Sequence, residues 1–185
     1  MALRKLICLG DSITEGEYSQ DGSERLTPRL RSALPGWTVR NAGIQGDHAH
    51  DALARLTRDV LCHNPDRVLI LLGANDAAFH KLVSLSAYLE SLTRIVSGVT
   101  PQKAILITPS PVDEARMFCR SNSVMAQYAG AVRSVAFDTG CRCIDLFTAM
   151  LATPHYPDFL SDGVHFTEAG YVFLAELVLS SIDWF

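Results

Sequence analysis

The side chains best suited to chemistry are a serine near the start of the chain and an acid and an imidazole near its end. Ser12 lies in the segment Gly-Asp-Ser-Ile-Thr at 10–14, directly after the apolar run 6–9. Such a run predicts a strand, and open α/β sheets place their chemistry at the carboxyl ends of strands. Asp162 and His165 are three residues apart, so one turn can present both. They predict a serine hydrolase with Ser12 as nucleophile, His165 as general base and Asp162 as its orienting acid.

Polar residues also follow the second and third apolar runs. Gly43 closes the segment Asn-Ala-Gly at 41–43, and Asn75 stands in Gly-Ala-Asn-Asp at 73–76. Attack by a serine on a carbonyl creates an oxyanion, which backbone N–H groups and amide side chains stabilise. The N–H groups of Ser12 and Gly43 and the side-chain amide of Asn75 are therefore the predicted oxyanion hole.

The elements that must position these residues alternate along the chain. Apolar runs predict strands at 6–9, 38–41, 67–72, 104–108 and 141–146, and helical spacing predicts helices at 25–33, 47–62, 86–97, 121–138 and 167–181, with Asp47 as the N-cap of the second helix. The third to fifth strands lack polar alternation, as parallel strands covered on both faces do. This order indicates a doubly wound α/β fold formed by one domain over residues 1–185.

Composition restricts the class of protein. The chain has 185 residues, 48% of them hydrophobic and 19% charged, with a formal net charge of −4. These values are typical of a soluble globular protein and argue against a nucleic-acid partner. No run has the length of a membrane span, and the N-terminus does not resemble a secretory leader. Five scattered cysteines favour free thiols, and thus a cytoplasmic location.

Neither a metal nor a cofactor is predicted. His48 and His50 lie within the second predicted helix, where residues two apart point about 200° from each other, so they are not expected to share an ion. Cys141 and Cys143 are separated by one residue and have no second pair, which favours two small apolar side chains on one strand. The expected partner is a small ester.

Together the four polar segments resemble the SGNH hydrolases, the GDSL-type esterase and lipase family. The matching blocks are 10–14, 41–43 with 46–47, 73–76 and 162–165. The resemblance implies a flavodoxin-like three-layer α/β/α sandwich with a five-stranded parallel sheet, and the roles given above for Ser12, Gly43, Asn75, Asp162 and His165. Ile13 stands where the family name has leucine, a volume-conserving change at a position expected to face the core.

Two segments narrow the resemblance. The stretches 159–171 and 108–113 are similar to the subgroup that includes isoamyl-acetate-hydrolysing esterases. This implies esters with short acyl chains. Arg116 and Arg120 follow the fourth predicted strand, where they are either surface charges or part of a substrate pocket or lid.

Other interpretations begin from the same first segment. A flavodoxin-like phosphate or nucleotide binding module would use Ser12, Thr14 and Gly16 at a helix N-terminus. However, the chain has neither G-x-G-x-x-G nor a P-loop there, and the late acid and imidazole are left without a role. A phosphotransfer site on Asp11 lacks the accompanying acidic residues and lysine, and an α/β-hydrolase elbow would need glycine in place of Thr14.

Overall fold

The computed structural model describes residues 3–181 and 183, and its centre is a five-stranded parallel sheet. The strands are β1 (Arg4–Gly10), β2 (Trp37–Gly43), β3 (Arg67–Leu71), β4 (Ala104–Ile107) and β5 (Arg142–Ile144). Their order in the sheet is β2-β1-β3-β4-β5, the flavodoxin-like order. All five predicted strands are confirmed. The last one ends early because the Asp145 side chain accepts a hydrogen bond from the Thr148 N–H and caps a helix.

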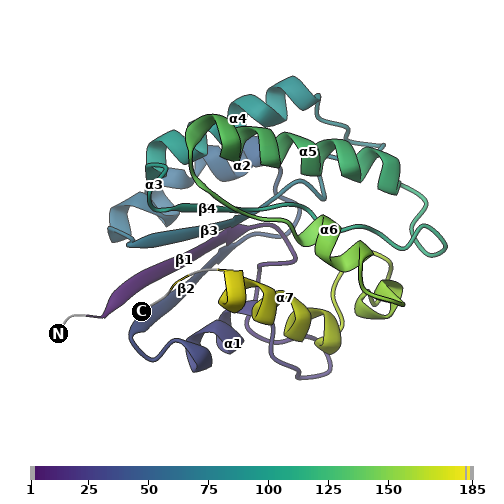
Figure 1. The fold of residues 1–185 in the computed structure, drawn as a ribbon, viewed down its shortest axis with the longest axis horizontal. Coiled ribbons are helices and arrows are strands. Elements are labelled where there is room, and N and C mark those ends of the chain that lie inside the picture. Colours follow the sequence, from purple (N-terminus) through teal and green to yellow (C-terminus); the bar gives the residue numbers. More distant parts are fainter. Residues whose placement is uncertain (1–2, 182, 184–185) are drawn as a thin grey trace.

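Helices cover both faces of this sheet (Figure 1). One face carries α2 (Ala49–Ala54), α3 (Leu56–Asp59), α4 (Leu85–Val99) and α5 (Asn122–Thr139), and the other carries α1 (Leu26–Ala33), α6 (Leu146–Leu151) and α7 (Glu168–Ser181). Alternate residues of β1 enter the two cores, Ile7 on the first side and Leu6 on the second. The predicted three-layer sandwich is therefore confirmed.

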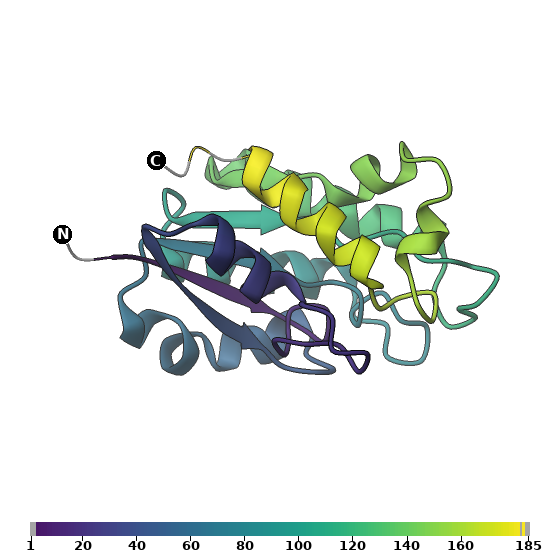
Figure 2. The ribbon, with the colours of Figure 1, turned by 90° about the horizontal axis from the view of Figure 1, so that it is seen from below.

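On the second face, a helix from the first part of the chain packs beside the last helix. Figures 1 and 2 show α1 and α7 lying side by side, and they are in contact. Two short elements were not predicted, α6 and the 3-10 helix η2 (Tyr156–Phe159), which lie between β5 and the last helix. None of the helices in the described part of the chain is long and apolar enough to cross a membrane.

The helix predicted at 47–62 is broken into α2, α3 and the 3-10 helix η1 (Leu61–His63). The break is at Arg55, whose backbone leaves the helical region and whose side chain is only 8% exposed. Its guanidinium donates to the carbonyls of Ala42 and Gly10, at 2.8 and 3.0 Å. It also binds the Asp47 carboxylate at 2.6 Å, so Asp47 is not the predicted N-cap, and His48 takes that position.

The register of the strands places the ends of β1, β2 and β3 at the same level, at the edge of the sheet where the polar segments lie. Gly10 at the end of β1 pairs with Gly43 of β2 and with Leu71 of β3. The segments after these three strands therefore start at one level and converge on one edge. Because parallel strands end together, the sheet brings residues from three distant parts of the chain to a single site.

Candidate active site

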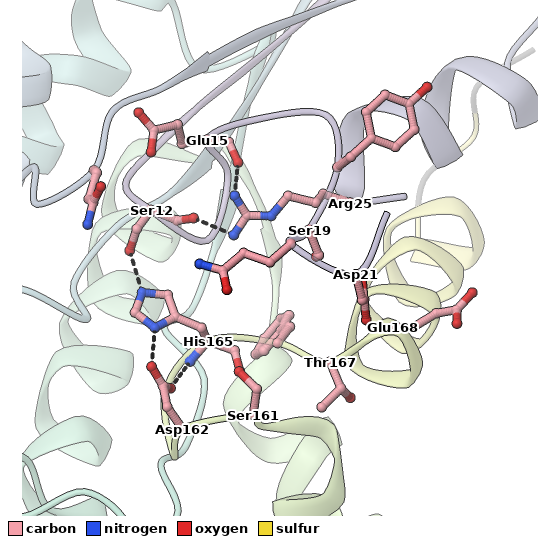
Figure 3. Close-up of a pocket in the computed structure, with 14 residues that line it drawn as sticks. Ser12, Glu15, Ser19, Asp21, Arg25, Ser161, Asp162, His165, Thr167 and Glu168 are labelled. Atoms are coloured by element: carbon pink, nitrogen blue, oxygen red, sulfur yellow. Dashed lines mark hydrogen bonds and ion pairs between the residues drawn. The ribbon is translucent and has the colours of Figure 1, made fainter. Parts of the chain in front are cut away.

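Ser12 lies in a tight turn directly after β1. The N–H groups of Thr14 and Glu15 donate to the Asp11 carbonyl at 3.1 and 2.9 Å, and the Asp11 Oδ1 accepts from the Ile13 N–H at 2.9 Å. Ile13 is buried in the core below the turn, as predicted. The turn leaves Ser12 half-buried, with its Oγ directed at His165 (Figure 3).

Arg25 fixes this turn from the side, a role the sequence analysis missed. Its guanidinium donates to the carbonyls of Ser12, at 2.9 Å, and of Glu15, and its Nε donates to the Tyr171 hydroxyl at 2.8 Å. The Tyr171 hydroxyl in turn donates to the Ile13 carbonyl at 3.0 Å. No local pattern marks Arg25, because its acceptors lie on a separate turn.

Asp162 and His165 lie on a second turn, just before α7. The Asp162 Oδ1 accepts from the N–H groups of Val164 and His165, at 2.9 and 2.8 Å, while Oδ2 lies 2.6 Å from His165 Nδ1. Between them Gly163 has a φ of +93°, a conformation that glycine adopts without strain. Val164 is 3% exposed and packs into the core.

The hydrogen bonds of this turn keep Asp162 ionised. Partial burial acts to raise the pKa of Asp162, but the bonds from His165 and from the two backbone N–H groups outweigh it and lower the pKa to about 2. A carboxylate beside Nδ1 favours the imidazole tautomer in which Nδ1 carries the proton and Nε2 accepts. The Ser12 Oγ lies 3.0 Å from that Nε2.

The structure does not support Gly43 as an oxyanion donor. Its N–H donates to the Asn41 Oδ1 at 2.9 Å and is therefore already used. Glycine is needed at this position for a different reason. A Cβ built there would lie 2.3 Å from the Glu15 backbone nitrogen, so only glycine lets β2 pass this close to the turn that carries Ser12.

The Asn75 side chain is hydrogen-bonded to a neighbouring backbone loop, at residues 45–47. The Asn75 Nδ2 donates to the Asp47 carbonyl at 3.0 Å, which uses one of its two hydrogens. Gly46 stands between Gln45, which lines the pocket described below, and Asp47. The N–H groups of Ser12 and Gly46 donate to no other residue in the described chain. These two groups and the second Nδ2 hydrogen remain available to a substrate oxygen.

A pocket of about 600 Å³ opens beside Ser12 and His165 (Figure 3). Most of its lining is polar or charged, namely Glu15, Ser19, Gln20, Asp21, Arg25, Gln45, Ser161, Asp162, Thr167 and Glu168. Tyr18 and Phe166 are its aromatic lining residues. Such a wall offers hydrogen-bond partners to a polar substrate.

Arg116 and Arg120 do not line this pocket. Arg116 pairs with Asp113 at 2.6 Å and donates to the carbonyls of Pro157, Leu160 and Ser161 at 3.1, 3.0 and 3.3 Å. It thus ties the loop after β4 to the segment before Asp162. Both arginines fix loops around the site, so neither is the simple surface charge nor the pocket wall that the sequence suggested.

The phosphate-binding alternative loses its structural basis. It requires a helix that begins at the Ser12 turn, yet the chain from 11 to 25 forms turns and an isolated bridge, and α1 begins only at Leu26. Thr14 is also 1% exposed, which removes its hydroxyl from any ligand outside the turn. In the described chain, no helix N-terminus therefore presents free N–H groups to a phosphate at Ser12.

The predicted divergence of His48 and His50 is wrong. His48 is the extended N-cap of α2 rather than a residue within a helix, so the two rings stack with centroids 5.3 Å apart. Asp51 contacts both, at 3.0 Å from His48 Nδ1 and 3.3 Å from His50 Nε2. The candidate ligand atoms of the three residues lie within 4.8 Å of one another. None of the three lines the pocket at Ser12.

Asp11 is a buried carboxyl group in the turn that carries Ser12. It is 1% exposed, and its Oδ2 has no hydrogen-bond partner among the described residues. Burial raises the pKa of Asp11 to about 6, against the hydrogen bond from Ile13, and the nearby Asp76 adds to the increase. Asp11 therefore changes charge near neutral pH.

Asp11→Asn is expected to become more stable relative to the natural protein as pH rises. Because the native pKa of about 6 lies above the ordinary 3.8, the native state binds the proton more tightly than the unfolded chain. The stabilisation is present below about pH 4 and is lost as pH rises through about 6, and the asparagine variant avoids this loss. The difference in free energy of unfolding should shift by up to about 3 kcal/mol towards the variant between about pH 4 and pH 7.

Urea unfolding at several pH values measures this shift. Asp138→Asn, at an exposed position on α5, is the matched control and should show no comparable trend. A difference between Asp11→Asn and the natural protein that stays constant with pH would contradict the burial argument.

An open parallel α/β sheet with a serine, a histidine and an aspartate in line at its carboxyl edge defines a class of ester hydrolases. The sequence profile of the GDSL-like lipase/acylhydrolase family matches residues 8–173, and the chain belongs to this family. The protein is a carboxylic ester hydrolase, as its named relatives are. The sequence-based resemblance is thereby confirmed.

Two curated relatives and one solved structure illustrate the similarity. The human isoamyl acetate-hydrolyzing esterase 1 homolog is 32% identical over 92% of this chain and 77% of its own. An acetylxylan esterase of Geobacillus stearothermophilus is 30% identical over 97% of this chain and 94% of its own. The crystal structure of a lipase/acylhydrolase from Enterococcus faecalis superposes with a TM-score of 0.90 at 32% identity, covering 96% of this chain and 94% of that one.

Proposed function

We propose that the protein hydrolyses short-chain carboxylic esters through an acyl-enzyme formed on Ser12. The observation that carries this proposal is the continuous line of contacts from Ser12 Oγ to His165 Nε2, at 3.0 Å, and from His165 Nδ1 to Asp162 Oδ2, at 2.6 Å. A serine hydroxyl with a base on one side, and with that base held by a carboxylate, is equipped for nucleophilic attack.

The reaction follows from these contacts in two halves. As the Ser12 Oγ attacks the ester carbonyl carbon, its proton moves to His165 Nε2. Collapse of the tetrahedral adduct breaks the bond to the alcohol oxygen, which receives that proton from His165. Water then attacks the acyl group and gives its proton to His165, and the carboxylic acid leaves while the proton returns to Ser12 Oγ.

The negative charge on the carbonyl oxygen is the main charge that the site must stabilise. We assign the donors as the N–H groups of Ser12 and Gly46 and the Nδ2 of Asn75, with Gly46 in place of Gly43. Gly46 is supported by its unused N–H and by its position next to Asp47, whose carbonyl holds Asn75. Each such donor contributes about 10²- to 10³-fold to kcat in sites of this kind.

The polar pocket supports a short acyl group and a hydroxylated alcohol. A long alkyl chain would remove water from Glu15, Asp21 and Glu168 without replacing its hydrogen bonds, which is unfavourable. The names of the two curated relatives refer to acetyl esters, namely isoamyl acetate and acetylxylan. Two solved variants of the Geobacillus acetylxylan esterase, described as catalytic mutants, replace a histidine and a serine by alanine.

A reducing compartment is part of the same proposal. All five cysteines are free, and Cys8 and Cys141 are buried. Free buried thiols fit a cytoplasmic enzyme better than a secreted one.

Two measurements test the proposed function. Hydrolysis of p-nitrophenyl acetate, butyrate and octanoate should show the highest kcat/KM for acetate and the lowest for octanoate. A fluorophosphonate probe should inactivate the enzyme, and mass spectrometry should find the probe on the peptide that contains Ser12. Preference for octanoate would contradict the short acyl chain, and inactivation with the probe on another residue would contradict the nucleophile.

A further inference from the structure

Arg120 connects the loop after β4 to the segment after β3. Its Nε donates to the Ala74 carbonyl at 2.6 Å, and its Nη2 donates to the Asn75 Oδ1 at 3.2 Å. Nη1 contacts the sulfur atoms of Met117 and Cys119, at 3.7 and 3.4 Å. Each nitrogen of the half-buried guanidinium therefore has a different partner, and two of them lie on the segment that carries Asn75.

These contacts determine which way the Asn75 amide faces. A guanidinium only donates hydrogen bonds, so the atom that faces Arg120 must be the amide oxygen. A backbone carbonyl only accepts them, so the atom that faces the Asp47 carbonyl, at 3.0 Å, must be the amide nitrogen. Because the amide oxygen and the amide nitrogen are both held, the direction of the second Nδ2 hydrogen is also fixed. A rotated amide would put two donors together at Arg120 and two acceptors together at Asp47.

We propose that Arg120 is a positioning residue for the oxyanion hole, acting through the side chain of Asn75. The inference rests on the proposed function, in which Asn75 donates to the oxyanion. A donor contributes fully only when it already points to where the charge develops. Arg120 holds Asn75 in that orientation before the substrate arrives. None of its hydrogen-bond partners given above, on the segment after β3 and on its own loop, lines the pocket.

The loop that carries Arg120 has a second attachment to the same segment. The Phe79 N–H donates to the Cys119 carbonyl at 2.8 Å, independently of the Arg120 side chain. Removing the guanidinium therefore leaves the loop connected while it frees the Asn75 amide to rotate. The expected effect is on the rate of the chemical step, since the ground-state contacts of the pocket do not change.

Arg120→Ala is expected to lower kcat by about 10- to 100-fold and to change KM by less than about 3-fold. Asn75→Ala alone should lower kcat by about 10²- to 10³-fold. In the Asn75→Ala background, the further change Arg120→Ala should cost less than about 2-fold, because the group on which Arg120 acts is gone. Steady-state kinetics with p-nitrophenyl acetate on the four proteins of this double-mutant cycle measure these effects.

Several results would overturn the proposal. An unchanged kcat in Arg120→Ala would show that Asn75 needs no support from Arg120. The same fold-loss in both backgrounds would show that Arg120 acts independently of Asn75. A loss confined to KM would place Arg120 in substrate binding instead.

A conservative variant tests the geometry where the alanine variant is unstable. Lysine keeps the charge but has one nitrogen, which cannot reach the Ala74 carbonyl and the Asn75 Oδ1 in the fork that arginine forms. Arg120→Lys is therefore expected to have a kcat between those of the natural protein and Arg120→Ala, and a full kcat would contradict the proposal. Arg94→Ala, at an exposed ion pair on α4, is the control and should keep full activity.

The failure of this proposal is distinguishable from failure of the proposed function. If Asn75→Ala and Arg120→Ala both retain full kcat while the fluorophosphonate probe still labels Ser12, then the serine chemistry stands and the Arg120 assignment is wrong. If the probe does not label Ser12, the proposed function itself fails.

Discussion

Replacing Ser12 with alanine is expected to lower kcat for p-nitrophenyl acetate by about 10⁶-fold, because a triad that lacks its nucleophile has no acyl-enzyme route. The residual rate should be that of water attack assisted by the oxyanion donors alone. The variant should fold normally. Among the described residues the Ser12 Oγ hydrogen-bonds to one side chain, at His165 Nε2, and His165 is 40% exposed, so water can replace the lost partner. The free energy of unfolding should change by no more than about 0.5 kcal/mol.

The measurement is steady-state hydrolysis beside circular dichroism and urea unfolding of the same preparations. Ser134→Ala removes an exposed serine hydroxyl on α5 and is the matched control, expected to keep full kcat. A Ser12→Ala enzyme that keeps a tenth of the natural rate would exclude Ser12 as nucleophile. Loss of rate together with loss of the folded circular dichroism spectrum would instead contradict the predicted neutrality of the substitution for folding.

The sequence predicts the framework of the site well, because that framework depends on local patterns. The strands β1, β3 and β4 are apolar runs buried on both faces, and a buried parallel strand tolerates few polar side chains. Ser12, Asn75 and the pair of Asp162 and His165 follow at strand ends or in a tight turn. These positions could be identified in the sequence, and the structure brings them to one edge of the sheet.

Long side chains that bond to distant backbone could not be predicted in the same way. Arg25, Arg55 and Arg120 each donate to carbonyls at least 10 residues away in sequence, and no local pattern encodes those partners. Arg55 shows the consequence for secondary structure. The apolar stripe over 47–62 favours one helix, but the bonds from Arg55 to the ends of β1 and β2 override that preference.

The proposed change of oxyanion donor from Gly43 to Gly46 rests on a contact that residue types alone do not reveal. Gly43 is the last residue of β2 and Gly46 follows three residues later, and the residue type alone does not indicate which of the two N–H groups is free to bind a substrate oxygen. The Asn41 side chain makes the difference, because its Oδ1 accepts a hydrogen bond from the N–H of Gly43, two residues later in the chain. Asparagine often bonds to the backbone two residues later, so this local contact is a usable signal in related sequences.

The turn that holds Asp162 determines how an asparagine would sit in its place. The Oδ1 of residue 162 accepts two backbone N–H groups, from Val164 and His165, at 2.9 and 2.8 Å. An amide oxygen can take over both bonds, whereas an NH₂ group would face two donors there. The amide of Asp162→Asn therefore keeps its oxygen on the turn and presents its NH₂ group to His165 Nδ1. The turn, and with it the fold, should remain intact.

Asp162→Asn is accordingly expected to lower kcat by about 10⁴-fold through the wrong histidine tautomer. Facing an NH₂ donor, His165 Nδ1 must accept, so Nε2 carries the proton and points it at Ser12 Oγ, which then has no base. Kinetics with p-nitrophenyl acetate measure the loss, and ¹⁵N NMR of the imidazole should show protonated Nε2 in the variant and protonated Nδ1 in the natural enzyme. Asp158→Asn, an exposed aspartate on η2, is the control and should match the natural enzyme in both readouts. A full kcat, or a large loss without a change of tautomer, would mean that Asp162 does not act by orienting His165.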